Sequence, residues 1–392
     1  MTPRVAYLLT QDRGGPVDVT VRLAAELAAS GRAEVRVFGP RPARDAELVR
    51  EHFQELEVPS KAAVGATRAA RAALRAWRPD VVHAQDRRSG LVVAGMAAGR
   101  GNPRAVVHTY HGVPDDVAEP WFRGRAGAAG PSRYTKVVLG ADAVVARSIG
   151  ATVVPSPSMG RFLRERLRVP ARRIVHIDNA VTLPAESAPT GPVRRLLFVG
   201  LLVERKGVAD LLAALERPGA FPADATLVVA GDGPERERLE KQAAQAGLGA
   251  RVEFLGFRSD VPDLLARSDA LVLPSRMEQQ PLVVAEAMAA GKPVLATDCG
   301  GVADMLDVPG AGSWLAEPGD TAGLAAALGE LFAEPDPGRT GRLLAERARA
   351  RFAPAVCATE HLRLYQRLLG SWGGWNDQTP GDQQQHPPKH PP

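Results

Sequence analysis

Residues 196–230, LLFVGLLVERKGVADLLAALERPGAFPADATLVVA, decide the fold class of this 392-residue chain. An apolar run at residues 196–199 is followed by a helix-period segment at 207–215 and by a second apolar run at 226–230. Parallel strands are buried on both faces and need a crossover connection, so two apolar runs joined through a helix predict a parallel strand-helix-strand unit.

The same alternation continues on both sides of this unit. Downstream, strands are predicted at residues 252–255, 270–274 and 293–297, with helices at 234–246 and 281–290. Upstream, strands are predicted at 5–10, 34–38, 81–84, 105–109, 143–146 and 174–177, with helices at 17–30, 62–77 and 89–98. The sequence therefore predicts an α/β fold with helices on both faces of parallel sheets.

Length and a proline-rich stretch indicate two domains. The chain exceeds the roughly 250–300 residues at which one hydrophobic core stops growing. Residues 183–192, LPAESAPTGP, carry three prolines without apolar periodicity and are typical of a linker. We expect one doubly wound domain at residues 1–188 and a second at 189–354.

The carboxyl-terminal part divides into a helix and a tail. Residues 355–370 form a helix-period segment that places Leu362, Tyr365 and Leu369 on one stripe. Residues 371–392, SWGGWNDQTPGDQQQHPPKHPP, lack the apolar side chains needed for a core. We expect this Pro/Gln-rich tail to be disordered.

Composition excludes several classes of protein. Hydrophobic residues make up 45%, charged residues 24%, and the mean hydropathy is -0.12, which is typical of a globular protein rather than a disordered or collagen-like one. No window approaches 18 consecutive apolar residues, and the start, MTPRVAYLLTQDRGG, becomes polar too early for a signal peptide. These features favour a cytoplasmic protein without integral membrane association, and peripheral contact stays open.

Charge and cysteine content point away from nucleic acid and metal. The net charge of +5 comes from 49 basic and 44 acidic residues, and the arginines alternate with acidic residues instead of aromatic ones. This pattern favours a solvated surface over nucleic-acid binding, while an anionic small ligand stays compatible. Cys299 and Cys357 stand alone and suggest neither a disulfide framework nor a zinc site.

Several signature motifs are incomplete or absent. Gly231 and Gly233 follow a strand as in a dinucleotide fingerprint, but Arg236 replaces the third glycine. Lys292 follows a glycine but precedes a proline and lacks the hydroxyl of a P-loop. No Asp-x-Asp triplet follows a strand, and Gly-x-Ser-x-Gly is absent. Nicotinamide, P-loop and serine-hydrolase chemistry are therefore disfavoured.

A pair of glutamates remains, in SRMEQQPLVVAEAMAAGKPVLAT. Glu278 is expected in a loop and Glu286 on the second turn of a helix that Pro281 opens. The first turn of that helix, around Gln280 and Leu282, presents unpaired backbone N–H groups and the positive end of the helix dipole. This end is a ready site for a phosphate.

The ordered motifs of the whole chain resemble one enzyme family. They comprise the glycine loop at Gly14 and Gly15, TYHG at residues 109–112, IDNAV before the linker, VGLLVERKG, VVAGDGPER, VEFLGF, and the glutamate pair followed by EAMAAGKPVLATDCGG. From Met1 to about Gly370 the sequence resembles the family 4 glycosyltransferases, retaining enzymes of the GT-B fold. The resemblance implies two Rossmann-like domains, a cleft between them, and a terminal helix that crosses back to the first domain.

The resemblance also implies an activity. It indicates transfer of a sugar from a nucleotide sugar, most often a UDP-sugar, to a hydroxyl acceptor in glycan or specialised-metabolite biosynthesis, without a metal or other cofactor. Two alternatives stay open on the sequence. One is another GT-B enzyme, such as a nucleotide-sugar epimerase or hydrolase; the other is a non-catalytic protein that binds sugar nucleotides. The acceptor and the oligomeric state are likewise left open.

Individual roles follow from the matching positions. Lys206 matches a lysine on the donor diphosphate, Glu286 a glutamate on the ribose hydroxyls, Glu278 a glutamate facing the transferred sugar, and His111 a histidine near the anomeric centre. The further donor contacts implied are Gly14, Gly15, Arg205, Gly231, Gly233, Phe257, Arg258, Gln280 and Leu282.

Three features depart from the family or allow two interpretations. Leu201 stands where most members carry arginine, and the sequence does not say whether Arg205 replaces that cation. Gln279 and Gln280 stand where many members carry Gly and Phe. The stretch Asp86, Arg87 and Arg88 either contacts an anionic acceptor or forms a capping loop with Ser89 as the helix N-cap.

Overall fold

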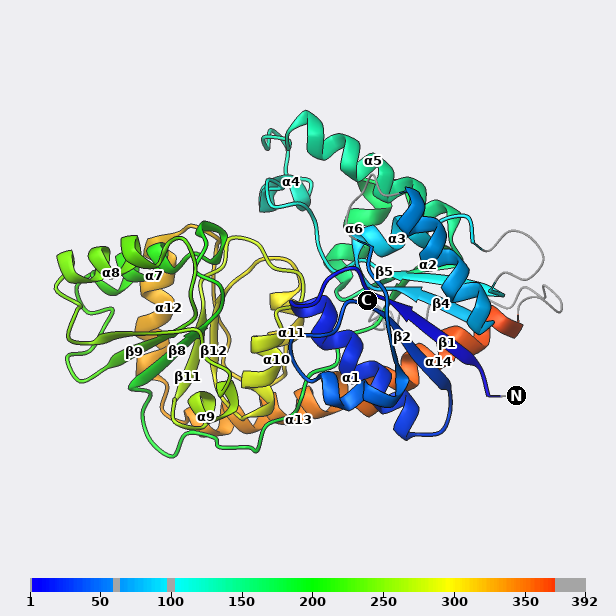
Figure 1. Ribbon diagram of the computed structural model, residues 1–392. Helices are drawn as coiled ribbons and strands as arrows, with labels where there is room; N and C mark the ends of the chain where they lie inside the picture. The colour runs from blue at the N-terminus through cyan, green and yellow to red at the C-terminus, as the bar shows by residue number, and fades with distance from the viewer. Residues whose placement is uncertain (1, 59–63, 97–102, 371–392) are drawn as a thin grey trace, which may run out of the picture.

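The computed structural model describes residues 2–58, 64–96 and 103–370, which build two parallel sheets with helices on both faces (Figure 1). The first sheet has the order β3-β2-β1-β4-β5-β6-β7. Its strands are β1 (Arg4–Leu8), β2 (Glu34–Gly39), β3 (Phe53–Glu55), β4 (Val81–Ala84), β5 (Ala105–Thr109), β6 (Ala151–Val154) and β7 (Ile174–His176). All of its pairings are parallel.

The second sheet repeats this winding with the order β10-β9-β8-β11-β12-β13. Its strands are β8 (Arg195–Val199), β9 (Thr226–Ala230), β10 (Val252–Gly256), β11 (Ala270–Leu273), β12 (Val294–Thr297) and β13 (Trp314–Ala316). The predicted α/β class with two doubly wound units is confirmed. The strand order reverses between β1 and β4 and between β8 and β11, and ligands of open α/β sheets bind beyond such reversal points.

Helices cover the two sheets. Around the first sheet lie α1 (Gly15–Ala29), α2 (Val64–Trp77), α3 (Arg87–Val93), α4 (Glu119–Phe122), α5 (Arg133–Ser148), α6 (Pro157–Glu165) and the terminal α14 (Pro354–Gly370). Around the second lie α7 (Val208–Leu215), α8 (Arg236–Gln245), α9 (Val261–Ala266), α10 (Leu282–Ala289), α11 (Val302–Leu306), α12 (Thr321–Ala333) and α13 (Pro337–Phe352). Short 3-10 turns lie at Ala46–His52, Ala171–Arg173 and Glu204–Lys206.

Period-two burial on β1 divides the first core into two halves. Val5 and Tyr7 join the cluster beneath α1 and α14, whereas Ala6 and Leu8 join the cluster beneath α2 and α3. Successive side chains of a strand point to opposite faces, so a strand that is apolar throughout packs helices on both sides. This explains why the strand showed no polar alternation in the sequence.

The chain passes from the first sheet to the second through residues 177–194, which contain no helix or strand. The predicted boundary after residue 188 lies in this segment. The return path runs through α13 and α14: α13 packs against α10, and α14 packs against α1 under the first sheet (Figure 1). The predicted tail, residues 371–392, lies outside the described residues.

One predicted strand was wrong. Residues 143–146 belong to the helix α5, and the strand that pairs with β5 is β6 at Ala151–Val154. Ser132 caps α5 by accepting a hydrogen bond from the Thr135 backbone N–H at 3.2 Å. Ala143, Val145 and Ala146 form its buried stripe, and so short an apolar run does not distinguish a buried helix face from a strand.

In the described part of the chain, no helix is long and apolar enough to cross a membrane. Cys299 and Cys357 are both free and buried.

Candidate active site

Loops from both sheets enclose a pocket of about 440 Å³, which we call the central pocket. Predicted site residues in its wall are Gly15, His111, Arg205, Lys206, Glu278, Gln280, Leu282 and Glu286. The wall also contains Asp18, Arg22 and Arg44, which the sequence did not single out. The central pocket thus draws on the loops that follow β2, β5, β8 and β11 and on the first two turns of α1 and α10.

Lys206 and Glu278 meet in this pocket from two different loops. Lys206 Nζ lies 2.5 Å from Glu278 Oε1, and the Ser275 hydroxyl donates to the same oxygen at 2.8 Å. The exposed side-chain fractions are 14% for Lys206 and 9% for Glu278. The carboxylate is therefore held by two donors, and the ammonium group keeps two of its three donors for other partners.

Gly207 allows the β8 loop to come this close to the end of β11. It has φ of 68°, and a Cβ atom at this position would lie 2.0 Å from the Pro274 carbonyl oxygen. Only glycine fits both the left-handed backbone and the contact. The glycine after ERK is thus the local reason why Lys206 reaches Glu278.

The amino end of α10 faces the same pocket. Pro281 precedes the helix without a side-chain cap, so the N–H groups of Leu282 and Val283 have no partner within the helix. The Gln280 side chain turns elsewhere: its Oε1 accepts from the Asn179 N–H at 2.6 Å, and its Nε2 donates to Asp178 Oδ1 at 2.5 Å. Gln280 therefore ties the start of α10 to the segment that joins the two sheets.

The first domain contributes the amino end of α1. Gly14 precedes the helix with φ of 102°, and a Cβ atom on Gly15 would lie 3.8 Å from Leu282 Cδ1. The first turns of α1 and α10 therefore face each other across the pocket. The end of α1 brings the Gly15 backbone N–H to this place, and the end of α10 brings those of Leu282 and Val283, each with the positive end of a helix dipole.

Glu286 lies one turn further along α10. Burial raises the pKa of its carboxyl group, and the Arg22 guanidinium of α1 opposes that rise. Arg22 Nη1 is 4.0 Å from Glu286 Oε1. Arg22, Asp18 and Gly15 follow one another at spacings of four and three on α1, and that spacing is the sequence signal that could have found them.

His111 follows β5 and is oriented by a residue at the end of β4. Its Nε2 lies 3.2 Å from Gln85 Oε1. Burial lowers the pKa of His111 to about 3, with His108 and His361 acting in the same direction. The imidazole is therefore neutral at ordinary pH, and with Nε2–H donated to Gln85 its Nδ1 is an acceptor.

Five of the predicted donor contacts lie outside the wall of the central pocket: Gly14, Gly231, Gly233, Phe257 and Arg258. Cβ atoms on Gly231 and Gly233 would lie 1.8 Å from the Gly200 oxygen and 2.4 Å from the Leu202 oxygen, so these glycines let the β9 loop pack on the β8 loop. Phe257 is 70% exposed, and Arg258 pairs with Asp260.

The three tentative acceptor contacts all have partners within the first domain. Asp86 caps α3 and accepts from the Thr10 hydroxyl at 2.7 Å, Arg87 pairs with the buried Asp142 at 2.8 Å, and Arg88 donates to the Val58 carbonyl at 3.0 Å. The helix N-cap is Asp86 and not Ser89, which corrects the capping interpretation. Ser89 is the third helical residue: its backbone N–H donates to the Asp86 carboxylate at 2.8 Å, and its hydroxyl accepts from the Asp86 backbone N–H at 2.9 Å, which is a capping box.

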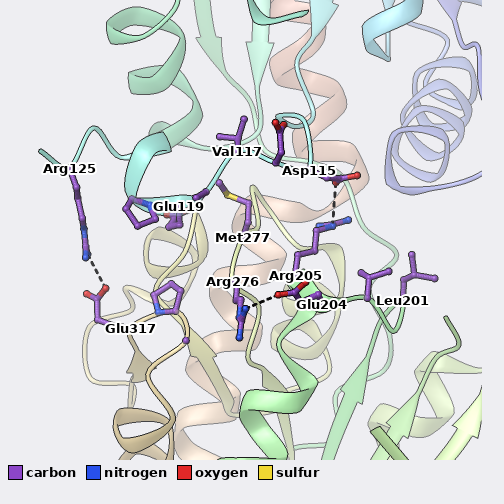
Figure 2. Close-up of a pocket in the computed structure, with 16 residues that line it drawn as sticks. Asp115, Val117, Glu119, Arg125, Leu201, Glu204, Arg205, Arg276, Met277 and Glu317 are labelled. Carbon is purple, nitrogen blue, oxygen red and sulfur yellow. Dashed lines mark hydrogen bonds and ion pairs between the residues drawn. The ribbon is translucent and has the colours of Figure 1, made fainter. Parts of the chain in front are cut away.

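A second, larger cavity adjoins the first, and we call it the side pocket. Its volume is about 760 Å³, and Figure 2 shows its wall. Asp115, Arg205 and Met277 line both pockets. Leu201, at the position of the missing family arginine, is 56% exposed and lies in the side pocket instead.

Ion pairs between the two domains border the side pocket. Arg205 Nε lies 3.6 Å from Asp115, and Arg125 reaches Glu317 at 2.9 Å (Figure 2). Nearby, Arg123 binds Asp298 at 2.7 Å. Arg205 thus lines the same pocket as Leu201, and it already has a carboxylate partner.

Within residues 2–58, 64–96 and 103–370, no group of three or more His, Cys, Asp and Glu side chains is arranged to hold a metal ion. Positive charge in the central pocket comes instead from Lys206, Arg22, Arg44, Arg205 and the helix ends.

Comparison with known proteins places this chain in a family. The model for Glycosyltransferase Family 4 matches residues 13–183, and the model for glycosyl transferases group 1 matches residues 193–334. A glycogen synthase from Mycobacterium tuberculosis is 30% identical over 299 residues, which cover 74% of this chain and 69% of that protein. The chain belongs to glycosyltransferase family 4.

Other members and solved structures agree with this assignment. A 2-deoxystreptamine glucosyltransferase from Streptomyces kanamyceticus is 30% identical over 265 residues, which cover 65% of this chain and 64% of that protein. Anabaena HepE in complex with UDP superposes with a TM-score of 0.75 at 19% identity, covering 93% of this chain and 100% of that one. Sucrose-phosphate synthase from Thermosynechococcus elongatus superposes with a TM-score of 0.75 at 23% identity, covering 94% of this chain and 100% of that one.

Membership of the family confirms the resemblance that the motifs carried, and the structural likeness confirms the GT-B fold. The chain is a glycosyltransferase. The central pocket lies between the two domains of this fold, where the loops of both sheets meet.

Proposed function

We propose that this glycosyltransferase moves a sugar from a UDP-sugar to a hydroxyl acceptor with retention of anomeric configuration and without a metal ion. One observation carries the proposal: Lys206, the amino ends of α1 and α10, and His111 converge on a single pocket between the domains. The UDP complex of the structural neighbour HepE supports uridine as the base. The glucosyltransferase and glycogen synthase relatives support a hexose as the transferred group.

The positive groups suit the departing diphosphate. When the bond between the anomeric carbon and the diphosphate oxygen breaks, negative charge grows on the phosphate oxygens. Lys206 Nζ and the unpaired N–H groups of Leu282 and Val283 are fixed near one another before the reaction begins. Pre-oriented donors of this kind contribute about 10²- to 10³-fold each, and they fill the role that a metal has in other transferases.

The sugar end of the pocket has Glu278 and a neutral histidine. Glu278 is already oriented by Ser275 and Lys206 and can accept hydrogen bonds from sugar hydroxyl groups. The neutral His111 offers an acceptor to a sugar hydroxyl without adding positive charge beside a developing oxocarbenium ion. Both groups therefore bind and orient the sugar.

The proposed step is a front-face substitution. The acceptor oxygen forms its bond to the anomeric carbon on the face from which the diphosphate leaves, and the proton of the acceptor hydroxyl passes to a diphosphate oxygen. The side pocket opens beside the central pocket through Asp115, Arg205 and Met277 and would admit the acceptor (Figure 2). Closure of the domains excludes water, which would otherwise hydrolyse the donor.

The test is proton NMR of the full chain with UDP-, GDP-, ADP- and TDP-sugars, with and without a mixed acceptor library. We expect acceptor-dependent release of UDP and a product with the anomeric coupling of the donor. Inverted coupling would contradict retention. Full activity after treatment with EDTA is expected, and loss of activity that Mg²⁺ or Mn²⁺ restores would contradict metal independence. Donor consumption without acceptor would indicate a hydrolase, and binding without consumption a sugar-nucleotide sensor.

A further inference from the structure

The solvent-facing side of α5 carries a stripe of apolar side chains. Tyr134, Val137 and Val144 are 69%, 72% and 63% exposed, and Ala141 between them is partly exposed. Steps of three, four and three residues place these four side chains on one face of the helix. Exposed apolar side chains are usually scattered singly, and a contiguous set marks a surface that contacts a partner or a membrane.

The remainder of the exposed face of α5 is basic. Arg133, Lys136 and Arg147 are exposed along one side of the apolar stripe. The one acidic residue of this helix, Asp142, is buried and pairs with Arg87 of α3 at 2.8 Å. The exposed face of α5 therefore combines apolar and positively charged side chains and has no acidic one.

Helices α2 and α3 extend this composition next to α5. Contacts join α2 to α3 and α3 to α5, and all three helices contribute side chains to one cluster over the same face of the first sheet (Figure 1). They carry eight basic residues and one acidic residue, whereas the whole chain has 49 and 44. Two more exposed apolar side chains, Val64 and Leu91, lie on α2 and α3. The helix α8, by contrast, alternates the two signs in RERLEK, so the excess of positive charge is not general to the surface.

We propose that the exposed residues of α2, α3 and α5, which we call the basic face, dock the enzyme on an anionic lipid bilayer. Anionic headgroups attract the arginine and lysine side chains, while the valines and the ring of Tyr134 enter the boundary between headgroups and acyl chains. A nucleic acid uses such cations but gains nothing from exposed valines, so the combination favours a membrane.

The basic face lies outside both pocket walls and beside one of them. No residue of α5 lines the central pocket or the side pocket. Asp116, in the wall of the side pocket, accepts from the Ser132 N–H at 3.0 Å and from the Thr135 hydroxyl at 2.6 Å, at the first turn of α5. Docking through α5 therefore brings the side pocket near the bilayer and leaves both pocket walls free.

The experiment is co-sedimentation of the full chain with vesicles, at low and at high salt. One set of vesicles is pure phosphatidylcholine, and the other has equal parts phosphatidylcholine and phosphatidylglycerol. The charge variant is Arg133→Gln/Lys136→Gln, and the apolar variant is Val137→Ser/Val144→Ser. All four side chains are exposed on α5, so the melting temperature and the Kd for UDP of both variants should equal those of the wild type.

The matched control is Arg363→Gln/Arg367→Gln. It removes two exposed cations from the same domain, but from α14, which packs on the opposite face of the first sheet. The control has the same net charge as the charge variant. It therefore separates the effect of the basic face from that of overall charge.

We expect the wild type to bind the anionic vesicles at least tenfold more tightly than the neutral ones, and this binding to weaken at high salt. Each basic residue near an anionic surface contributes about fivefold, so the charge variant should bind about 25-fold more weakly and lose part of the salt dependence. The apolar variant should bind about tenfold more weakly and keep the salt dependence of the wild type. The control should bind like the wild type.

Equal binding of the wild type to both kinds of vesicle would overturn the proposal, and so would wild-type binding by the charge and apolar variants. An equal loss in the control would assign the effect to net charge. Tighter binding to poly(U) than to vesicles would assign the basic face to nucleic acid, and self-association that the apolar variant abolishes would assign it to a second copy of the chain. Vesicle binding only by a chain that ends at Gly370 would assign it to residues 371–392. Vesicle binding needs neither nucleotide nor acceptor, so its failure leaves the proposed transfer reaction standing.

Discussion

Replacing Lys206 by methionine separates its catalytic role from its structural one. The substitution removes the ammonium group and keeps most of the side-chain volume. Lys206 is proposed to donate to the diphosphate as negative charge develops, and loss of one such donor costs about 10²- to 10³-fold in kcat, or about 3–4 kcal/mol. The substitution also leaves Glu278, whose side chain is 9% exposed, with Ser275 as its remaining donor.

Stability should fall as well. Breaking a buried ion pair by removing one partner costs about 3–5 kcal/mol, and the hydrogen bond from Ser275 places the loss at the low end of this range. About 3 kcal/mol corresponds to a decrease in Tm of roughly 6–12 °C for a domain of this size. The double variant Lys206→Met/Glu278→Gln removes the unpaired charge and should regain most of the lost Tm.

The assay measures UDP release with saturating acceptor, beside a thermal melt of each variant. We expect Lys206→Met to lose at least tenfold in transfer and the double variant to recover Tm without recovering transfer. A Lys206→Met enzyme with wild-type turnover would refute the assignment of the diphosphate site. A double variant that regains turnover together with Tm would show that Lys206 acts only by neutralising Glu278.

Four further results are expected. Gln85→Leu should lower kcat about tenfold with little change in KM for the donor, because it releases the His111 ring; steady-state kinetics check this, and a change confined to KM would contradict it. The Kd of the wild-type enzyme for UDP should rise as pH falls, because burial raises the pKa of Glu286 and its carboxylate, which accepts hydrogen bonds, is lost as pH falls through that raised value. Calorimetry of Glu286→Gln should show no such dependence on pH. In the wild-type enzyme, kcat should show no imidazole titration between pH 5.5 and 8, because the pKa of His111 is about 3. Gly207→Ala should lower Tm strongly, since it adds about 1–2 kcal/mol of backbone strain to a clash with Pro274, and unchanged melting would contradict the packing of the β8 loop.

Patterns within short stretches predicted much of the fold. The apolar runs at β8 and β9 and the helix period between them specified a parallel unit, because burial on both faces leaves no polar alternation. The same logic failed at residues 143–146, where a buried helical stripe imitates a strand. The strands β3 and β13, each three residues long, carry too few positions for a period to appear.

The candidate site was only partly readable. Glu278 and Glu286 could be placed on a loop and a second helical turn, and the structure has them there. The direction of the Gln280 side chain could not be read, because Asp178 and Asn179, which bind it, belong to the segment between the sheets. The roles given to Phe257 and Arg258 stay predictions.

The sequence by itself determined most of the order of strands and helices, the motifs at the strand ends and, through them, the family. These are local properties, since period and turn chemistry act over a few residues. The tertiary structure decided which motifs meet. Arg22 faces Glu286, and Arg123 binds Asp298, because α14 returns to the first core and the two domains come to lie with α1 opposite α10. Such contacts depend on the packing of distant elements, and no spacing along the chain records it.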